Sequence, residues 1–583
     1  MRRTASVGVC VWASLLACGG GGDASTGAST GGDPSGATST PTSGDPSGDP
    51  SGDPGGPTSG ATSSATSGDP STDPSGDPSA DPSGPTTDTG EPPPATCEAA
   101  GGSATVNAPE LHVILKDRWE EAWLGSAAIA DLDGDGTMEI VVPRGEALVA
   151  WSPDGAVRWK VPAAGRIWAS PVVADFVGDA KLEVAFASRQ QVTLLDATGA
   201  VLRGFPIEWE DEMRSLAAAD IDGDGGLDLA AAPAHGGPTD VMHAWRSDGS
   251  PVAGFPPNAT GSSGCDDKCY LAGCYDQNMA LGDLDGDGKA DLVAPHDNAY
   301  VSIHKGTGEA FDAAAIYPVK KTPGVRYLHV LAEAMQGYAD DEETALQAHF
   351  TNTAPAIADI DGDGTREVIL LASVQNAAQT DREKGVAVWV VGRDGARHPN
   401  FMTPVHRPDY LSGLWDYGDN IVAITNQASI ADISPEPGLE IVFPGFDGAI
   451  HAVSAAGQVL WSRTYTDDAL VAAAGVAIGD LSADGSPEIV FNTYSTASDR
   501  GELVILSATG ELLHQLPLPR RGAMPVPSLG DIDGDGVVDI VVSLKDAEDK
   551  VESVQVYRVP GSAMNCLPWP TGRGNLLRSG LVP

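Results

Sequence analysis

Basic side chains are scarce in this sequence, whereas acidic ones are abundant. The 583 residues include 34 lysines and arginines against 81 aspartates and glutamates, which gives a formal net charge of -47 at pH 7. Such a chain repels the phosphates of nucleic acid and the head groups of anionic membranes, and it attracts divalent cations. We therefore expect no nucleic-acid partner.

Long apolar segments and compact catalytic motifs are also missing. Beyond residue 17 no stretch is apolar enough to cross a bilayer. The sequence contains no G-x-S-x-G nucleophile elbow, no H-E-x-x-H zinc motif and no phosphate-binding glycine loop that leads into a helix. These absences favour an exported protein that binds a ligand over an enzyme.

The N-terminus has the features of a secretion signal. Arg2 and Arg3 precede the apolar stretch Val7–Leu16, which is too short to span a membrane. The Leu-Leu-Ala-Cys sequence that ends at Cys18 resembles the lipobox of bacterial lipoproteins. The resemblance implies a signal peptide over residues 1–17 and a lipid on Cys18 that anchors the protein to the bacterial outer membrane or cell surface. The alternative is an ordinary secretory signal in which the cysteine is incidental.

The segment that follows, residues 18–96, cannot form a core. From residue 23 onward it consists almost entirely of Gly, Ser, Thr, Pro, Ala and Asp, with ten aspartates and no Lys, Arg or His. Such a composition cannot repay its ordering entropy by burying apolar surface, and like charges keep it extended. We expect a disordered linker between the anchor and a folded part over residues 97–583.

One unit of sequence recurs eight times downstream of the linker. Each copy is a short apolar strand, a loop rich in Asp and Gly, and a strand of Ile, Val and Leu, as in IADLDGDGTMEIVV. The loops of the successive copies begin at Asp131, Asp175, Asp220, Asp283, Asp359, Asp432, Asp480 and Asp531. The base period of about 45 to 50 residues accommodates four strands and their turns.

The first copy shows the expected strands, at residues 127–130, 139–142, 148–151 and 157–161. Asp-Gly and Thr-Gly pairs, typical of tight hairpin turns, recur at the third joint of the copies. Four antiparallel strands repeated eight times describe an all-β fold, a β-propeller of eight four-stranded blades, with seven blades as the alternative. The copies resemble the FG-GAP or VCBS repeats of bacterial surface proteins and of the integrin α head.

A propeller has to close, because otherwise its first and last blades leave open sheet edges. The last copy supplies only three strands, and the segment 110–115 precedes the first loop without a blade of its own. We expect this segment to complete the last blade. Cys97 and Cys566 flank the two segments, so we expect a disulfide between them, which export to an oxidising compartment permits; two free thiols are the alternative.

The repeated loop predicts a calcium site. Carboxylates at positions one, three and five lie on one side of a tight glycine turn, a carboxylate at position nine follows on the next strand, and such hard oxygen ligands select Ca²⁺. Strands flank the loop, which excludes an EF-hand. Five copies have all four carboxylates: Asp131, Asp133, Asp135 and Glu139; Asp220, Asp222, Asp224 and Asp228; Asp283, Asp285, Asp287 and Asp291; Asp359, Asp361, Asp363 and Glu367; Asp531, Asp533, Asp535 and Asp539.

Three copies predict weaker calcium sites, because one of the four carboxylates is missing. Two have serine at position three and keep Asp432, Glu436 and Glu440, or Asp480, Asp484 and Glu488. The second copy has Val177 at position three and is doubtful. We expect about five strong calcium sites, and up to seven or eight in all. Because four carboxylates in one loop repel one another unless a cation neutralises them, calcium is expected to stabilise the fold.

Extra residues separate the third to sixth copies, mostly after the fourth strand, and so on the face opposite the metal loops. Aromatic and polar side chains on loops over a rigid scaffold often bind ligands. The candidates are Tyr327, His329, His406, Tyr410, Trp415 and Tyr417. Packing of the insertions against the blades is the alternative role for them. The segment 330–350 within one insertion has a helix-like sequence.

The insertions also contain Cys265, Cys269 and Cys274. Because no histidine nearby completes a zinc site, we expect one disulfide and one remaining thiol. The whole pattern predicts a monomeric surface protein that recognises a glycan or a protein through the insertion face. The alternatives are a polysaccharide lyase, with His329, His406, Tyr410 and Lys320 acting on an acidic sugar, and a purely structural surface protein.

Overall fold

The computed structural model describes residues 97–582 except 117–120, 210, 235–239, 267, 270–278, 297, 326–327, 329–345, 351–352, 377, 379, 418–419, 425–426, 498 and 549–551. These residues all belong to one unit, Pro82–Pro583. The signal segment, Cys18 and the linker up to residue 96 lie outside the described residues, so they stay predictions. Within the described residues, no helix has both the length and the apolar character to cross a bilayer.

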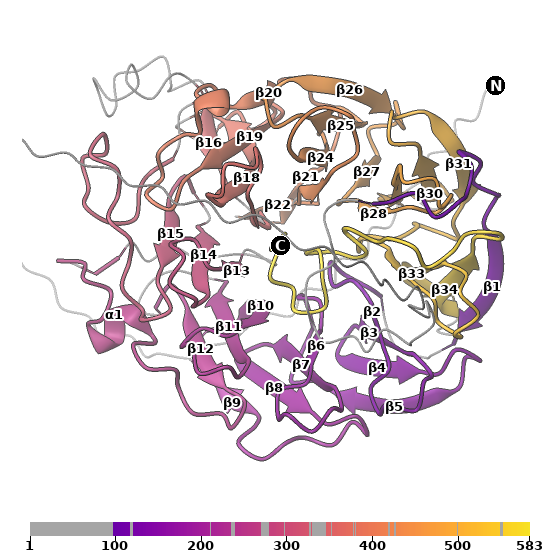
Figure 1. Cartoon of the computed structure of the whole chain (residues 1–583), viewed down its shortest axis with the longest axis horizontal. Helices are drawn as coiled ribbons and strands as arrows, with labels where there is room; N and C mark the ends of the chain where they lie inside the picture. Colours follow the sequence, from indigo (N-terminus) through magenta and orange to yellow (C-terminus); the bar gives the residue numbers. More distant parts are fainter. Residues whose placement is uncertain are drawn as a thin grey trace, which may run out of the picture. The chain divides into compact units, whose positions relative to one another are not determined.

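Eight antiparallel blades form a ring, which Figure 1 shows end on. Blade one contains β2 (Ala128–Ala130), β3 (Glu139–Arg144), β4 (Ala147–Trp151) and β5 (Val157–Pro162); blade two contains β6 (Val172–Ala174), β7 (Glu183–Ser188), β8 (Gln191–Leu195) and β9 (Ile207–Glu208). Blade three contains β10 (Met213–Ala219), β11 (Asp228–Pro233) and β12 (His243–Arg246); blade four contains β13 (Ala280–Gly282), β14 (Asp291–Pro295) and β15 (Val301–His304). In these two blades the fourth strand is reduced to single bridges, Trp245 to Pro251 and His304 to Ala310.

The second half of the ring repeats the pattern. Blade five contains β16 (Gln347–His349) and β17 (Ala356–Ala358), both paired with β18 (Glu367–Gln375), then β19 (Val386–Val391) and β20 (Val405–Arg407). Blade six contains β23 (Ser429–Ala431), β24 (Glu440–Pro444), β25 (Ala449–Val453) and β26 (Val459–Thr464). Blade seven contains β27 (Val471–Ala473), β28 (Ala477–Gly479), β29 (Glu488–Ser495), β30 (Glu502–Leu506) and β31 (Leu512–Pro517). A hairpin, β21 (Leu414–Tyr417) and β22 (Asn420–Ala423), and the short helices α1 (Pro257–Thr260) and η2 (Pro399–Phe401) lie between blades.

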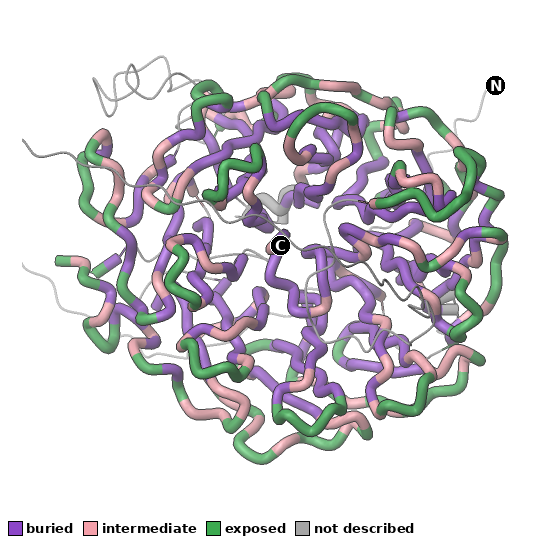
Figure 2. Tube along the Cα trace, in the orientation of Figure 1, coloured by how far each residue is buried: buried purple, intermediate pink, exposed green. Residues whose placement is uncertain are grey.

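The core lies between neighbouring blades. In blade one, β3 and β4 are buried at every position, whereas β5 alternates between exposed and half-buried residues. The inner strands read as continuous apolar runs because both of their faces pack against a blade. Val141 of blade one and Val184 of blade two, for example, share one cluster of buried side chains. Figure 2 shows the same distribution, with exposed segments at the rim and buried ones toward the centre.

The ring closes between the two ends of the chain, as the sequence predicts. Blade eight contains β32 (Ser528–Gly530), β33 (Asp539–Glu548) and β34 (Glu552–Arg558), and its outer strand is β1 (Glu110–Leu115). β1 pairs antiparallel with β34, from Glu110 opposite Arg558 to Leu115 opposite Val554. The inner strands β32 and β2 are neighbours, so no blade is left with a free inner edge. The expected disulfide between Cys97 and Cys566 is present beside this seam.

The C-terminal segment after Cys566 closes the ring a second time, from inside. Its carbonyl oxygens accept hydrogen bonds from the backbone N–H groups of inner strands around the ring: Ile478 to Trp569, Leu529 to Pro570, Val173 to Leu576, Ala218 to Leu577, Leu281 to Ser579 and Ile357 to Gly580. Arg578 of this segment is buried, and its guanidinium donates to the carbonyl oxygens of Pro171 and Ala127. The C-terminus accordingly lies at the centre of the ring in Figure 1.

Two expectations about the insertions have definite outcomes. Gln347–His349 form strand β16 along β18, so the helical prediction for 330–350 is wrong at its C-terminal end, and most of that segment lies outside the described residues. Pairing with β18 offers the backbone hydrogen bonds that a local helix would have supplied. Cys265 and Cys269 form a disulfide, which confirms the expectation of one bridge within the cysteine cluster; Cys274 is not described.

Removing the disulfide across the seam should destabilise the whole propeller. Cys97 and Cys566 are 469 residues apart, so their bond excludes many unfolded conformations, and loss of a native disulfide typically costs about 2–5 kcal/mol. We expect Cys97→Ser/Cys566→Ser to lower the midpoint of denaturant unfolding. The matched control is Cys265→Ser/Cys269→Ser, which opens a bridge between residues only 4 apart and should shift the midpoint far less. Equal midpoints for the two double variants would contradict this account of closure.

Candidate metal centres

The acidic loops lie at the joint between the first and second strands of each blade, and backbone hydrogen bonds fix their shape. In blade one the Asp131 carboxylate accepts from the backbone N–H groups of Gly134, Asp135 and Gly136 at 2.8, 3.1 and 2.8 Å. Gly134 and Gly136 have φ of 76° and 85°, a region that favours glycine. The carboxylate at position one therefore holds the turn as well as facing its centre.

The carboxylate at position nine links the loop to the second strand in every blade. One of its oxygens accepts the N–H of the residue at position two, at distances of 2.7 to 3.3 Å in the eight blades. Position nine is also the first residue of the buried second strand, so the side chain is almost completely buried, with Glu139 1% and Asp291 0% exposed. A carboxyl group is thereby placed at the bottom of each loop.

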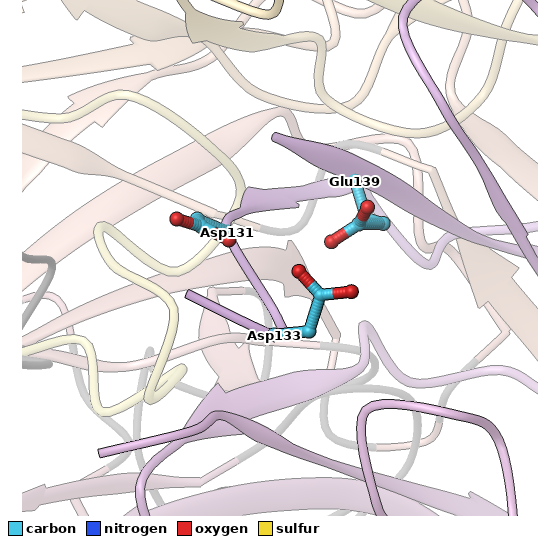
Figure 3. A group of neighbouring side chains, drawn as sticks. All are labelled: Asp131, Asp133 and Glu139. Atoms are coloured by element: carbon cyan, nitrogen blue, oxygen red, sulfur yellow. The ribbon is translucent and has the colours of Figure 1, made fainter. Parts of the chain in front are cut away.

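Five of the loops bring three carboxylates together, so that one oxygen of each lies within 4.8 Å of the others. The groups are Asp131, Asp133 and Glu139; Asp220, Asp222 and Asp228; Asp283, Asp285 and Asp291; Asp359, Asp361 and Asp363; Asp531, Asp533 and Asp535. They belong to the five copies with a complete set of carboxylates, although each group contains three of the four predicted residues. Figure 3 shows the first group converging on one point.

Buried oxygens without hydrogen bonds indicate that a cation fits these groups. In blade four, Oδ2 of Asp291 accepts from Leu284 N–H at 2.9 Å, whereas Oδ1 of Asp291 and Oδ1 of Asp285 are buried and accept no hydrogen bond. In blade one, Asp133 Oδ1 is likewise buried without a hydrogen bond, whereas Glu139 Oε1 lies 3.3 Å from the Arg158 guanidinium. A buried carboxylate oxygen without a donor is costly, and a divalent cation among oxygen ligands removes that cost. These acidic groups can hold a metal ion.

Burial raises the pKa of the carboxyl groups at position nine. Desolvation, reinforced by the neighbouring aspartates, raises the pKa of Asp228, Asp291 and Glu367 to about 7 and that of Asp539 to about 6. Near pH 7 each of these carboxyl groups is protonated in part of the molecules unless a bound cation lowers its pKa. A cation that binds here therefore competes with protons.

A basic side chain also reaches each of the five groups, which the sequence reasoning missed. Arg158 contacts Asp133, Arg246 contacts Asp222, Lys305 contacts Asp285, His398 contacts Asp361 and Arg558 contacts Asp533. The argument that only a metal neutralises these carboxylates was therefore wrong, because the protein supplies some positive charge itself. A signal was available in the sequence: Arg158, Arg246 and Arg558 follow position three by 25, 24 and 25 residues.

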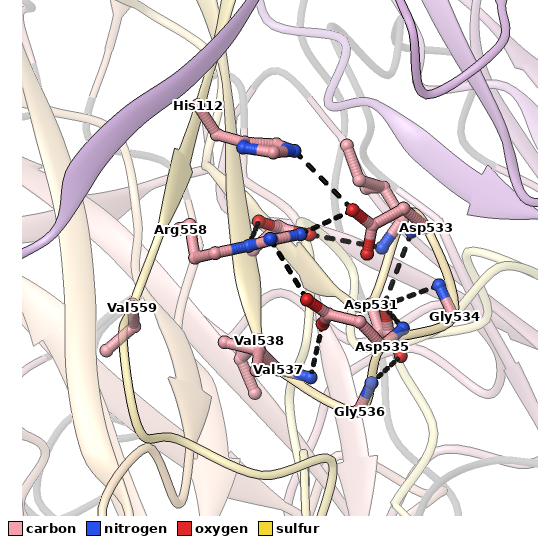
Figure 4. A network of polar contacts seen from close by, with 12 residues as sticks. His112, Asp531, Asp533, Gly534, Asp535, Gly536, Val537, Val538, Arg558 and Val559 are labelled. Carbon is pink, nitrogen blue, oxygen red and sulfur yellow. Dashed lines mark hydrogen bonds and ion pairs between the residues drawn. The ribbon is translucent and has the colours of Figure 1, made fainter.

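The group in blade eight shows the arrangement best (Figure 4). Arg558, at the end of β34, lies 2.6 Å from Asp533, 2.9 Å from Asp535 and 3.4 Å from Asp539, and His112 of β1 lies 3.5 Å from Asp533. One guanidinium thus contacts three carboxylates. Because Arg558 and His112 come from the two strands that meet at the seam, this loop is connected to ring closure.

The three weaker copies satisfy their carboxylates without a cation. In blade six, Ser434 at position three donates to Oε1 of Glu440 at 2.8 Å, while Ile433 N–H donates to Oε2. In blade seven, Asn565 donates to Asp480 at 2.7 Å. Asp432, Glu436, Asp484 and Glu488 join no group of three within the described residues. In blade two, Val177 removes a ligand, and both its N–H and that of Phe176 bond Glu183.

The candidate ligand residues on the opposite face fall into three cases. Tyr327 and His329 lie outside the described residues, and Trp415 and Tyr417 are on β21 with side chains that are not described. His406 on β20 is half-buried, and its Nε2 lies 2.7 Å from the carbonyl oxygen of Lys384. Tyr410 packs edge-on against Phe446 and donates to the Leu414 carbonyl at 3.5 Å. His406 and Tyr410 therefore contribute to packing of the insertions.

No protein-family model matches this chain, and no match is found among curated proteins. Solved structures do resemble it. The V. cholerae biofilm matrix protein Bap1 is 14% identical, with 82% of this chain and 96% of that chain covered and a TM-score of 0.47. Quinohemoprotein alcohol dehydrogenase from Comamonas testosteroni is 12% identical, with 81% of this chain and 79% of that chain covered and a TM-score of 0.46. Bacillus licheniformis rhamnogalacturonan lyase is 15% identical, with 74% of this chain and 71% of that chain covered and a TM-score of 0.41. The likeness concerns the fold alone, which a matrix protein and two enzymes share.

The raised pKa values predict how the metal-free protein responds to pH. Asp228, Asp291 and Glu367 have a pKa of about 7 in the folded protein, whereas the ordinary pKa is 3.8 for an aspartate and 4.5 for a glutamate. At pH values between the ordinary pKa and the raised pKa, the folded state binds more protons than the unfolded chain. The free energy of unfolding therefore falls as pH rises through this range. We expect the metal-stripped protein to melt at a higher temperature at pH 5.5 than at pH 8, measured by scanning calorimetry.

General repulsion within an acidic protein acts in the same direction, so the scan is repeated in 1 M NaCl, where the screening length is about 3 Å. The difference between the two pH values should persist there, because the position-nine carboxyls are buried. Its disappearance in high salt would assign the effect to surface charge and contradict the role of these three groups.

Proposed function

We propose that this chain is a calcium-stabilised binding protein of the bacterial cell surface, built on FG-GAP or VCBS repeats. The observation that carries the calcium part is the set of five acidic groups, of which the group in blade four has buried oxygens without hydrogen-bond donors on Asp285 and Asp291. Oxygen-only ligands and high acidic charge suit Ca²⁺ better than a transition metal. Two disulfides support export to an oxidising compartment, as a lipid anchor at Cys18 requires.

The proposed ligand is a glycan or a protein, held on the face opposite the calcium loops. The C-terminal segment supports this choice, because it bonds inner strands of most blades and so occupies the centre of the ring. The loops that follow the second and fourth strands are then the surfaces open to a partner. Loops on a rigid scaffold vary without disturbing the core, which suits recognition. We propose a monomer that meets the membrane only through its lipid.

Calcium should raise the melting temperature, and a single carboxylate in a complete group should carry part of that rise. Glu139→Gln in blade one removes a buried carboxylate of the group with Asp131 and Asp133, so we expect it to reduce the rise produced by millimolar calcium and to lower the number of bound ions measured by elemental analysis. Magnesium, which demands a smaller octahedral site, should replace calcium poorly.

The matched control is Glu440→Gln in blade six, at the same position of a loop whose serine already bonds that carboxylate. It should leave both the calcium-dependent rise and the ion count unchanged. Identical effects of the two variants would show that the loops do not differ in metal binding, and an unchanged melting temperature after calcium removal would refute the proposed stabilisation.

Retention of the full chain on a glycan array, with a parallel assay for unsaturated sugar products, separates binding from catalysis. Retention without turnover is the expected result. Release of unsaturated products would assign a lyase activity instead, and neither retention nor turnover would leave a structural or protein-binding role.

A further inference from the structure

A ladder of alternating cations and aromatic rings lies on the face opposite the calcium loops, outside the insertions. Lys545 Nζ lies 3.3 Å from the ring centroid of Trp123, and Arg166 Cζ lies 4.1 Å from Trp123 and 4.9 Å from Trp168. Arg214 Cζ lies 4.4 Å from Trp168 on the far side of the ladder. The two indoles are 4.8 Å apart. Each cation is attracted by the negative face of a neighbouring ring, which orders the ladder.

The ladder is assembled from blades that are far apart in sequence. Trp123 precedes β2, Arg166 and Trp168 lie between β5 and β6, and Lys545 lies in the second half of β33. These are the joints that follow fourth and second strands, so all of them face away from the calcium loops. Ring closure at the seam between blades eight and one therefore creates the site.

Arg166 differs from the other cations of the ladder in its partners. Lys545 lies 2.9 Å from Glu121, and Arg214 lies 2.8 Å from Glu212. The half-buried Arg166 has no carboxylate partner in the part of the chain that the structure describes, and its guanidinium is held by the two indoles. A planar guanidinium in this state presents its N–H groups to an anion from outside.

A second unused donor lies beside it. Trp123 Nε1 is buried and donates no hydrogen bond, whereas Nε1 of Trp168 donates to Glu212 at 3.2 Å. Buried indole N–H groups normally find an acceptor. The burial of Trp123 Nε1 keeps this N–H out of reach of an external ligand, so the Trp123 ring orients Arg166 and the guanidinium alone meets the anion.

The surrounding charges define what kind of anion fits. Glu121, Glu212 and Asp546 border the ladder, and each is already paired with a basic side chain of the network. Among the described residues of this network, one positive charge therefore remains unmatched, at Arg166. A densely charged ligand, such as an acidic peptide, would meet repulsion from the bordering carboxylates. A sugar ring with one carboxylate and several hydroxyl groups matches the single charge and offers donors to those carboxylates.

We propose that Arg166 and Trp123 form a binding site for a uronate residue of an acidic glycan. The carboxylate of the uronate accepts from the Arg166 guanidinium, which the Trp123 ring holds in place, and its hydroxyl groups donate to Glu121 or Glu212. This proposal rests on the proposed function and specifies its ligand class. It places the recognition site over blades eight, one and two, rather than in the insertions between blades three and six.

The test measures binding of the calcium-loaded full chain to immobilised uronate oligosaccharides. The probes are hyaluronan, heparosan, oligogalacturonate and oligomannuronate fragments, each beside its methyl ester, which keeps the ring and removes the charge. We expect at least one probe to bind, its ester to bind about tenfold or more weakly, and Arg166→Gln to reduce the affinity for that probe by about tenfold. Trp123→Leu, which removes the ring that orients Arg166, should weaken it by several-fold.

The matched control is Arg203→Gln, the same change at an exposed arginine between β8 and β9 on the calcium face. It should leave binding unchanged, and equal melting temperatures of the two variants show that loss of binding is not unfolding. Arg166→Lys keeps the charge without the planar fork and should restore binding only in part.

Three results would overturn the proposal in different ways. Binding that Arg166→Gln does not weaken would place the glycan elsewhere, for example across calcium ions, and leave the proposed function intact. A polyglutamate peptide that binds more tightly than every uronate would identify an acidic protein segment as the ligand. No binding of any probe by the unaltered chain would remove the uronate site, while calcium-dependent stability would remain as separate support for the calcium part of the proposed function.

Discussion

The hydrogen bond from position two to the carboxylate at position nine is present in all eight blades. It spans seven residues, from Leu132 to Glu139 in blade one through Ile532 to Asp539 in blade eight. It fixes the acidic loop to the first residue of the second strand, so that the carboxylate is buried whether or not the loop can hold a metal. The primary role of the acidic residue at position nine is therefore structural. Its second oxygen is what remains for a cation, and blades six and seven show that a serine can take that place.

Ring closure depends on two segments, one from each end of the chain. β1 supplies the outer strand of blade eight, whereas the segment after Cys566 bonds the inner strands. The disulfide joins Cys97, which precedes β1, to Cys566, where the C-terminal segment begins. Because each blade buries its faces against its neighbours, an open ring would expose two apolar sheet faces as well as an edge. Closure by β1 at the rim and by the C-terminal segment at the centre covers these faces and the edge. The C-terminal segment also occupies the centre of the ring, where a ligand could otherwise bind.

Electrostatics divide the two faces of the ring. On one face, acidic loops are partly balanced by single basic side chains, such as Arg158 and Arg558, and oxygen atoms remain for a cation. On the other face, Glu121, Glu212 and Asp546 are paired with lysine and arginine, and Arg166 remains without an acidic partner among the described residues. A chain of net charge -47 thus carries a local excess of positive charge where the repeats themselves impose no acidic loop.

The sequence by itself determined the repeat and the position of the acidic loops, because each strand and loop is specified by residues within one copy. It favoured eight blades over seven. The segment that completes the last blade and the disulfide between Cys97 and Cys566 were predicted from the requirement that a ring has to close. The sequence did not determine which loops retain unsatisfied oxygens, because Arg246, Lys305 and His398 reach their aspartates only after the blade has folded. Nor could it reveal the ladder of Trp123, Arg166 and Lys545, whose members come from segments more than 400 residues apart. Such contacts are decided by ring closure, which brings the two ends of the chain together and which no local pattern encodes.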